Sequence, residues 1–319
     1  MKIVDRGGGT PVVVVPGIQG RWEWMKPAID ALAQRCRVIT FSLADEPSCD
    51  APFDETRGFS CYVDQVRDAL DAAGVREAAI CGVSYGGLIA AAFAARYPDR
   101  ASSLVVVSAL PPSWRPDRRV MFYLRAPRLL TPIFLIASLR MYGEIAAANP
   151  GFGRGLGAAV RHGARVISHM FSPRRMARRV HVLASLDLRE ELARVRRPTL
   201  VITGDPSLDR VVPVEATREY AELWPRARVA TIARTGHLGL ITRPDEFARL
   251  VVRFAEESSR EHESSGPFEL IEYHPQQASE RDLPAATTRG PRRARLRGGV
   301  RAERPVPLQE GRSTKRRVG

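Results

Sequence analysis

The stretch AAICGVSYGGLIAAAFAAR, residues Ala78–Arg96, decides the fold. It begins with the apolar run Ala78–Cys81, continues through the turn GVSYGG at 82–87, and ends in an alanine-rich segment of high helix propensity. We therefore expect a strand, a sharp turn and a helix in direct succession. Gly-x-Ser-x-Gly in this setting is typical of a nucleophile elbow, a strained turn that holds a serine above the end of a sheet.

The glycines at 82 and 86 suit such a turn, because its backbone segments approach too closely for side chains. Ser84 would stand at the N-terminus of the following helix, where free N–H groups and the helix dipole favour developing negative charge. The motif alone is weak, because a chain with this content of glycine and serine also produces it by chance. The flanking strand and helix, together with suitable Asp and His residues downstream, strengthen the prediction.

β-Branched and apolar runs on both sides of this stretch predict further buried strands. Strands that alternate with helices at this spacing indicate a mostly parallel α/β sheet with right-handed crossovers. The expected strands are Met1–Val4, Thr10–Val15, Arg37–Phe41, Ala78–Cys81, Ala101–Ser108, Thr199–Thr203 and Arg228–Ile232, and the helices outside the motif are Met25–Ala33, Phe59–Ala72, Val214–Leu223 and Asp245–Glu257.

The domain organisation follows from where this alternation stops. Residues 111–190 contain helical segments interrupted by Arg and Pro, without strands, which predicts a helical cap over the carboxyl edge of the sheet, where ligands bind in such folds. The core is then formed by residues 1–110 and 191–257. Residues 258–319 are poor in aromatic side chains and rich in Arg, Pro and Gly, and we expect them to be a disordered basic tail.

The net charge of +14 is unevenly distributed. Residues 289–319 hold eleven Arg or Lys against two Glu, a balance of +9, which leaves +5 for the other 288 residues. We therefore attribute the basic character mostly to the tail. No aromatic side chain accompanies its arginines for base stacking, so we expect no specific nucleic-acid partner and only weak contact with anionic surfaces.

Cysteine usage and the N-terminus bear on the cellular compartment. Cys36, Cys49, Cys61 and Cys81 lack metal-ligand spacing, and the first residues carry charges that do not fit a secretory signal. The longest apolar region, Leu129–Tyr142, contains Pro132 and Arg140 and is too short to span a membrane. We expect a cytoplasmic protein without disulfides, metal or cofactor.

Three stretches carry a resemblance to a known family: VVVVPGIQG at 12–20, CGVSYGG at 81–87 and TGHLGLITRPDEFARLVVRF at 235–254. Through them, residues 10–257 resemble the α/β-hydrolase fold superfamily in its single-domain form with a helical cap. The last stretch is the most specific, because a Gly-His pair followed by Arg-Pro-Asp-Glu-Phe at the start of a final helix is the usual ending of the superfamily.

The resemblance implies a catalytic triad and an oxyanion hole. Ser84 would be the nucleophile, His237 the general base and Asp209 the acid that orients it, with the backbone N–H groups of Ile18 and Tyr85 binding the oxyanion. Asp209 is preferred over Asp205 because Asp209-Arg210-Val211-Val212-Pro213 matches the x-x-Val-Pro segment that follows the acid in similar proteins.

The chain departs from the superfamily pattern around the first loop. Pro16-Gly17 stands where many relatives have His-Gly, so the chain lacks the histidine that braces this loop; the N–H of Ile18 needs no particular side chain. SLADEP at 42–47 replaces the usual glycine-rich motif at the pocket border. Trp22 and Trp24 either line the pocket or pack against the fold.

Four arginines in the predicted cap also have two interpretations. Arg174, Arg175, Arg178 and Arg179 either form a solvated helix face or attract an anionic substrate or membrane surface.

We therefore predict a serine hydrolase that cleaves a small carboxylic ester or related acyl compound through an acyl-enzyme. An acyltransferase or a carbon–carbon bond hydrolase would use the same triad, and a non-catalytic interaction protein is the third alternative. Nothing in the sequence decides the substrate or the oligomeric state.

Overall fold

Seven strands form a single sheet in the computed structural model, which describes residues 1–149 and 152–264. Their order across the sheet is β1-β3-β2-β4-β5-β6-β7; β1 pairs antiparallel with β3, and all other neighbours are parallel. The mostly parallel α/β sheet predicted from the sequence is confirmed. The strands are β1 (Val4–Arg6), β2 (Pro11–Val15), β3 (Arg37–Thr40), β4 (Ala78–Val83), β5 (Ala101–Val107), β6 (Thr199–Thr203) and β7 (Arg228–Thr231).

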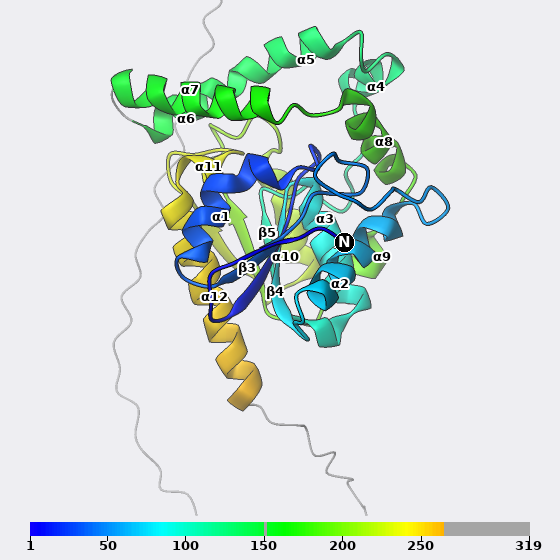
Figure 1. Cartoon of the computed structure of the whole chain (residues 1–319), viewed down its shortest axis with the longest axis vertical. Helices are drawn as coiled ribbons and strands as arrows, with labels where there is room; N and C mark the ends of the chain where they lie inside the picture. Colours follow the sequence, from blue (N-terminus) through cyan, green and yellow to red (C-terminus); the bar gives the residue numbers. More distant parts are fainter. Residues whose placement is uncertain (150–151, 265–319) are drawn as a thin grey trace, which may run out of the picture. The chain divides into compact units, whose positions relative to one another are not determined.

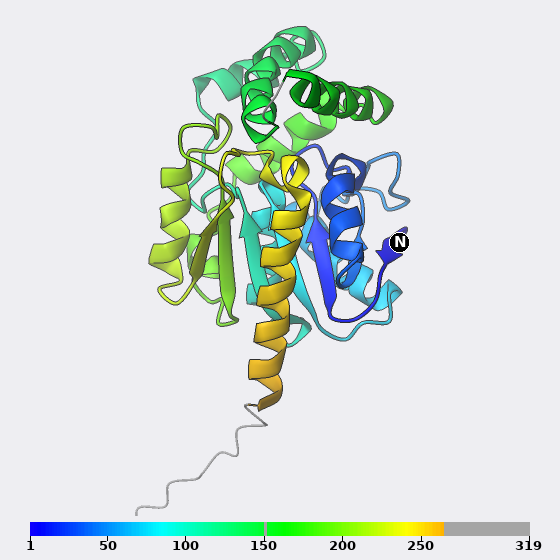
Figure 2. The same ribbon diagram turned by 90° about the vertical axis from the view of Figure 1, so that its left-hand side faces the viewer.

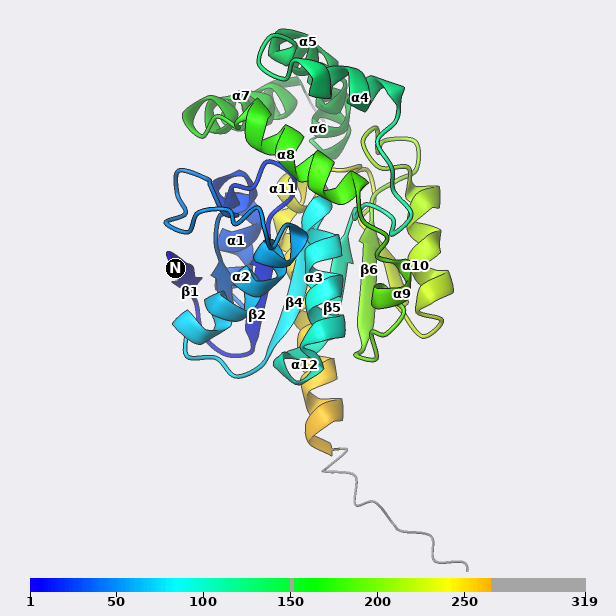
Figure 3. The same cartoon turned by 90° about the vertical axis from the view of Figure 1, so that its right-hand side faces the viewer.

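Helices cover both faces of the sheet because alternate side chains of its central strands point in opposite directions. Val12 and Val14 pack with α1 (Lys26–Ala33) and α12 (Pro244–Ser264), the face seen in Figure 2. Val13 and Val15 belong to the buried hydrophobic cluster on the other face, together with side chains of α2 (Phe59–Ala72) and α3 (Tyr85–Arg96) (Figure 3). Tyr220 of α10 (Arg218–Leu223) and Trp224, which follows it, complete this cluster. The central strands are therefore buried on both faces, which accounts for their unbroken apolar sequences.

Most predicted elements are present, with boundaries shifted by a few residues. The helix Phe59–Ala72 and the strand Thr199–Thr203 have the predicted limits. The first strand lies at Val4–Arg6 instead of Met1–Val4. The predicted helix Val214–Leu223 is divided into the 3₁₀ turn η4 (Val214–Thr217) and α10, and a short helix α11 (Gly239–Thr242) was not anticipated.

Only helices are described between β5 and β6. Figure 1 shows α4–α8 gathered at one end of the sheet. We propose that residues 111–190 form the cap, and the word is used for them below. The helices in order are α4 (Arg118–Arg125), α5 (Thr131–Ser138), η3 (Leu139–Met141), α6 (Tyr142–Ala148), α7 (Phe152–Ser168), α8 (Pro173–Ala184) and α9 (Arg189–Leu192).

The last helix is longer than the sequence predicted. α12 continues to Ser264, so residues 258–264, assigned to the disordered tail, are helical. Ser258 is buried and the Ser259 hydroxyl donates to the Ala255 carbonyl at 2.9 Å, so both serines fit the helix. The rest of the predicted tail, residues 265–319, lies outside the described residues. None of the helices in the described ranges has the length and apolar character needed to cross a membrane.

Candidate active site

Ser84 occupies a strained turn between β4 and α3. Its backbone has φ 53° and ψ −119°, a left-handed conformation that is unusual for a non-glycine residue. Its N–H donates to the Val107 carbonyl at 2.9 Å, which ties the turn to the end of β5. A Cβ on Gly82 would lie 2.2 Å from the Gly86 carbonyl oxygen, and one on Gly86 would lie 2.5 Å from the Val15 and Pro16 oxygens. Both positions of the motif therefore require glycine.

The first loop, residues 16–20, passes directly beside this serine. A Cβ on Gly17 would lie 3.5 Å from the Cβ of Ser84, and the Gly20 N–H closes the loop on the Gly17 carbonyl at 2.8 Å. Within the described chain, neither the N–H of Ile18 nor that of Tyr85 donates to another group. Tyr85 opens α3, so its N–H is one of the donors that a helix N-terminus leaves without a partner.

Asp209 and His237 meet on the loops that follow β6 and β7. His237 Nδ1 lies 3.5 Å from Asp209 Oδ2, and the N–H groups of Val211 and Val212 each donate to Asp209 Oδ1 at 2.9 Å. His237 Nδ1 has no hydrogen-bond partner in this arrangement, so we describe the contact as a close approach of the ring to the carboxylate. Burial acts to raise the pKa of Asp209, but His237 and the two N–H groups together hold that pKa below its usual value.

The loop after β6 that carries Asp209 (the acid loop) packs closely against the loop after β7 that carries His237 (the histidine loop). A Cβ on Gly236 would lie 2.5 Å from the Leu208 carbonyl oxygen and 2.7 Å from the Asp209 nitrogen. Asp205 instead braces the loops, since its Oδ2 accepts from the Arg234 N–H at 2.5 Å and its N–H donates to the Thr235 carbonyl at 2.6 Å. Of the two acid candidates, the structure places Asp209 beside the His237 ring.

Ser84, Asp209 and His237 thus follow strands β4, β6 and β7 at the carboxyl edge of the sheet. Among the hydrogen bonds of the described residues, none joins the Ser84 hydroxyl to His237. Hydrogen bonds between catalytic side chains are often long or poorly aligned until substrate binds.

A family model described as the alpha/beta hydrolase family matches residues 12–250. The chain belongs to this family. It is accordingly an enzyme of the alpha/beta hydrolase type.

Named relatives of this alpha/beta hydrolase have diverse substrates. Poly(3-hydroxyalkanoate) depolymerase of Ectopseudomonas oleovorans is 29% identical over 258 residues, which cover 78% of this chain and 85% of that protein. 2-Hydroxy-6-oxo-2,4-heptadienoate hydrolase of Pseudomonas putida is 28% identical over 270 residues, covering 78% and 90%. The solved structure of an esterase from Exiguobacterium antarcticum has a TM-score of 0.65 at 19% identity, covering 80% of this chain and 94% of that one, which is a likeness of fold.

A carboxylate that the sequence analysis missed reaches the histidine loop of this hydrolase from the cap. Glu144 of α6 is 3% exposed, and its Oε1 accepts from the Leu238 N–H at 2.6 Å. Burial raises the pKa of Glu144 to about 7, although the N–H groups of Gly236 and Leu238 and the nearby His237 act to lower it. The one sequence signal was that residues 111–180 contain only two acidic residues, Asp117 and Glu144.

An arginine of the cap braces the first loop in the place of the missing histidine. Arg179 of α8 is fully buried; its Nη1 donates to the Ile18 carbonyl at 2.8 Å and its Nη2 to Glu46 Oε1 at 2.6 Å. The interpretation of the four cap arginines as a solvated face is therefore wrong for Arg179. Arg178 pairs with Asp45, and Arg175 Nη1 approaches Glu46 Oε2 at 3.8 Å.

Of the two tryptophans, Trp24 has a packing role between the core and the cap. Its Nε1 donates to the His169 carbonyl at 2.8 Å, and its ring makes edge contacts with His162 and Phe171. Trp22 lies under the guanidinium of Arg6, 5.8 Å from the ring centroid.

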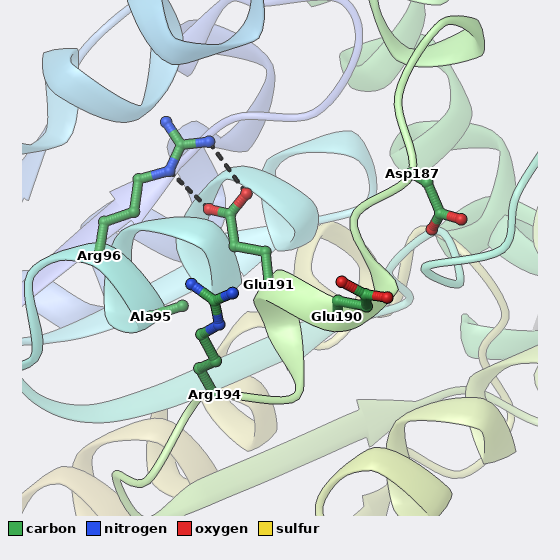
Figure 4. Close-up of a pocket in the computed structure, with 6 residues that line it drawn as sticks. All are labelled: Ala95, Arg96, Asp187, Glu190, Glu191 and Arg194. Carbon is green, nitrogen blue, oxygen red and sulfur yellow. Dashed lines mark hydrogen bonds and ion pairs between the residues drawn. The ribbon is translucent and has the colours of Figure 1, made fainter.

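No group of three or more His, Cys, Asp or Glu within the described ranges is arranged to hold a metal ion, and all four cysteines are free. A hollow of about 600 Å³ lies at the C-terminal end of α3, whereas Ser84 precedes its N-terminus. Figure 4 shows Glu191 forked onto Arg96, with nitrogen–oxygen distances of 2.5 and 3.1 Å, and Arg194, Glu190 and Asp187 around them. The helix between them separates this hollow from the candidate active site.

Proposed function

We propose that this alpha/beta hydrolase is a serine hydrolase that cleaves a carboxylic ester or a related small acyl compound. The observation that carries the proposal is the close approach of His237 and Asp209 at the same sheet edge as a serine in a strained turn. Family membership supports hydrolysis in general, and Ser84, His237 and Asp209 are our assignment of the residues that perform it.

In the proposed mechanism, His237 removes the proton from the Ser84 hydroxyl as its oxygen attacks the acyl carbonyl. Asp209, kept ionised by its low pKa, fixes the ring tautomer and stabilises the imidazolium. The N–H groups of Ile18 and Tyr85 bind the oxyanion, a contribution of about 3–4 kcal/mol per donor in a comparable hydrolase.

Collapse of the tetrahedral intermediate expels the alcohol, which takes its proton from the His237 imidazolium. His237 then deprotonates a water that attacks the acyl-enzyme, and the acid product leaves with Ser84 restored. An acyltransferase would replace this water by another acceptor.

A carbon–carbon bond hydrolase is the second candidate. It is favoured by the 28% identity to the Pseudomonas putida hydrolase described above, whereas the depolymerase at 29% identity favours an ester. Both reactions would use Ser84, His237 and Asp209, and we keep the ester as the main proposal.

The test is labelling by a fluorophosphonate probe, which reacts with activated serines. Wild-type protein should be labelled, and Ser84→Ala should not, with circular dichroism unchanged. Ser108→Ala is the matched control, because Ser108 is also buried, also directly follows a strand and also has a positive φ of 42°. Labelling that survives in Ser84→Ala would refute the assignment of the nucleophile.

A further inference from the structure

The cap exposes far more apolar surface than the rest of the described chain. Twelve of the fourteen exposed large hydrophobic side chains lie between residues 121 and 170. Leu129, Ile136, Ile167 and Met170 are the most exposed of them, at 78, 68, 76 and 66%. Single exposed hydrophobic side chains are ordinary, but a concentration on one segment marks an interaction surface.

Eight of these twelve side chains belong to α4, α5 and α7, and Leu129 and Met170 lie in the segments just after α4 and α7. Figures 1 and 3 show α4, α5 and α7 above the strand ends, with no other described element on their outer side. In α7, Leu156, Val160 and Ile167 are spaced by four and seven residues and therefore share one face of the helix. α5 has the sequence TPIFLIAS and is apolar along almost its whole length. We call the outer surface of α4, α5 and α7 the cap face.

The segment that carries the cap face is also strongly basic, although its Arg179 is buried. Residues 111–180 contain thirteen Arg and no Lys against Asp117 and Glu144, a net charge of +11. Exposed arginines stand among the apolar side chains of α4, as in Arg118-Arg119 beside Met121 and Phe122. Together with the +9 of residues 289–319, this leaves the other parts of the chain with −6. The sequence analysis attributed the basic character mostly to the tail, but residues 111–180 carry a larger net charge than residues 289–319.

A hollow of about 580 Å³ opens beside α4, where Leu124 and Pro127 line it. Arginines and a histidine dominate its lining: Arg128, Arg174, Arg175, Arg178 and His181. Asp45 is the one acidic residue that lines it, and it pairs with Arg178. The remaining positive charge suits a phosphate or carboxylate headgroup.

We propose that the cap face docks on an anionic phospholipid bilayer. The apolar side chains would enter the boundary between headgroups and acyl chains, and the arginines would pair with lipid phosphates, as on interfacial amphipathic helices. A second copy of the chain fits less well, because two such faces would bring like charges together. The same charge argument disfavours residues 289–319 as the occupant. This proposal is independent of the proposed hydrolysis.

The experiment is flotation of the full chain with vesicles of phosphatidylcholine alone or with 30% phosphatidylglycerol. We expect binding to the anionic vesicles at least tenfold tighter than to the neutral ones, weakened by 0.5 M salt. Ile136→Ser with Ile167→Ser removes two exposed apolar side chains and should reduce binding at least tenfold. Val229→Ser, 63% exposed on β7, is the matched control and should bind as wild type.

A charge variant tests the second contribution separately. Arg118→Gln with Arg119→Gln should reduce binding to anionic vesicles severalfold and lessen its salt dependence, while Arg76→Gln, at an exposed site outside the cap, should not. Fluorophosphonate labelling in the absence of vesicles should be unchanged in all these variants, which keeps this test apart from that of Ser84.

Three outcomes would overturn the proposal. The wild type could fail to bind the anionic vesicles. Both cap variants could bind as wild type does, which would assign binding to another segment. Alternatively, Ile136→Ser with Ile167→Ser could abolish a dimer measured by sedimentation and leave vesicle binding intact, which would make the cap face an interface between two copies.

Discussion

Substitution of Glu144 by Gln should make the stability of the protein less dependent on pH. Glu144 is buried between α6 and the histidine loop, and its pKa is raised from 4.5 to about 7, mainly because burial disfavours its charged form. In the unfolded chain the carboxyl titrates near its ordinary value. Between these two values the folded state holds a proton that the unfolded state has lost.

The sign and size of the effect follow by linkage. The stabilising contribution of the protonated carboxyl is fully present below about pH 4.5 and is lost as the pH rises through about 7. One pKa unit corresponds to about 1.4 kcal/mol, so the whole shift amounts to about 3 kcal/mol. A glutamine at 144 cannot ionise, but its Oε1 can still accept from the Leu238 N–H.

Urea unfolding of wild type and Glu144→Gln from pH 4 to pH 8.5 measures this difference. The two should have similar free energies of unfolding at pH 4, and the variant should be about 3 kcal/mol more stable at pH 8.5. Glu190→Gln, an exposed change in α9, controls for loss of a carboxylate elsewhere. If the free energies of unfolding of wild type and Glu144→Gln differ by the same amount over this whole pH range, the argument that a buried, titrating carboxyl lies between cap and core is refuted.

Three further predictions concern the loops around the site. Asp209→Asn should lower kcat toward an acyl substrate on the order of 10⁴-fold, whereas Asp205→Asn should mainly lower the Tm. If steady-state kinetics show the larger loss of kcat in Asp205→Asn, the acid role belongs to Asp205. Arg179→Met should cost about 3–5 kcal/mol in urea unfolding because the buried Glu46 loses its hydrogen-bonded partner and keeps only Arg175 at 3.8 Å, and a loss below about 1 kcal/mol would contradict this. Gly86→Ala should lower stability by about 1–3 kcal/mol or more in the same assay, since its methyl group would lie 2.5 Å from two carbonyl oxygens, and a neutral result would mean that the turn can relax.

Local patterns accounted for most of the sheet and for the sharp turn at Ser84. Unbroken β-branched runs such as Val12–Val15 are buried on both faces, so their residue types and length were sufficient to predict strands. The glycines of the elbow were predicted from the motif itself. The steric requirement at Gly82 is local, because a Cβ there would meet Gly86, whereas at Gly86 it involves the distant Val15 and Pro16. The mostly parallel sheet and its family followed from these features.

The interactions between cap and core could not be predicted in the same way. Glu144 contacts Leu238, and Arg179 contacts Ile18, across 94 and 161 residues of sequence. Neither contact leaves a periodic pattern, and an arginine in a basic helix gives no sign that it is buried. The cytoplasmic location and the lack of a specific nucleic-acid partner stay predictions.

The contacts of Arg179 have a consequence for engineering this protein. Caps are inserted between two strands and look exchangeable as cassettes between members of a family. Here a transplanted cap would remove the guanidinium that holds the Ile18 carbonyl and would leave Glu46 in the core without a counter-ion. A chimera should therefore keep α8 together with the loops that carry Ile18 and Glu46, or replace Glu46 with a neutral residue at the same time.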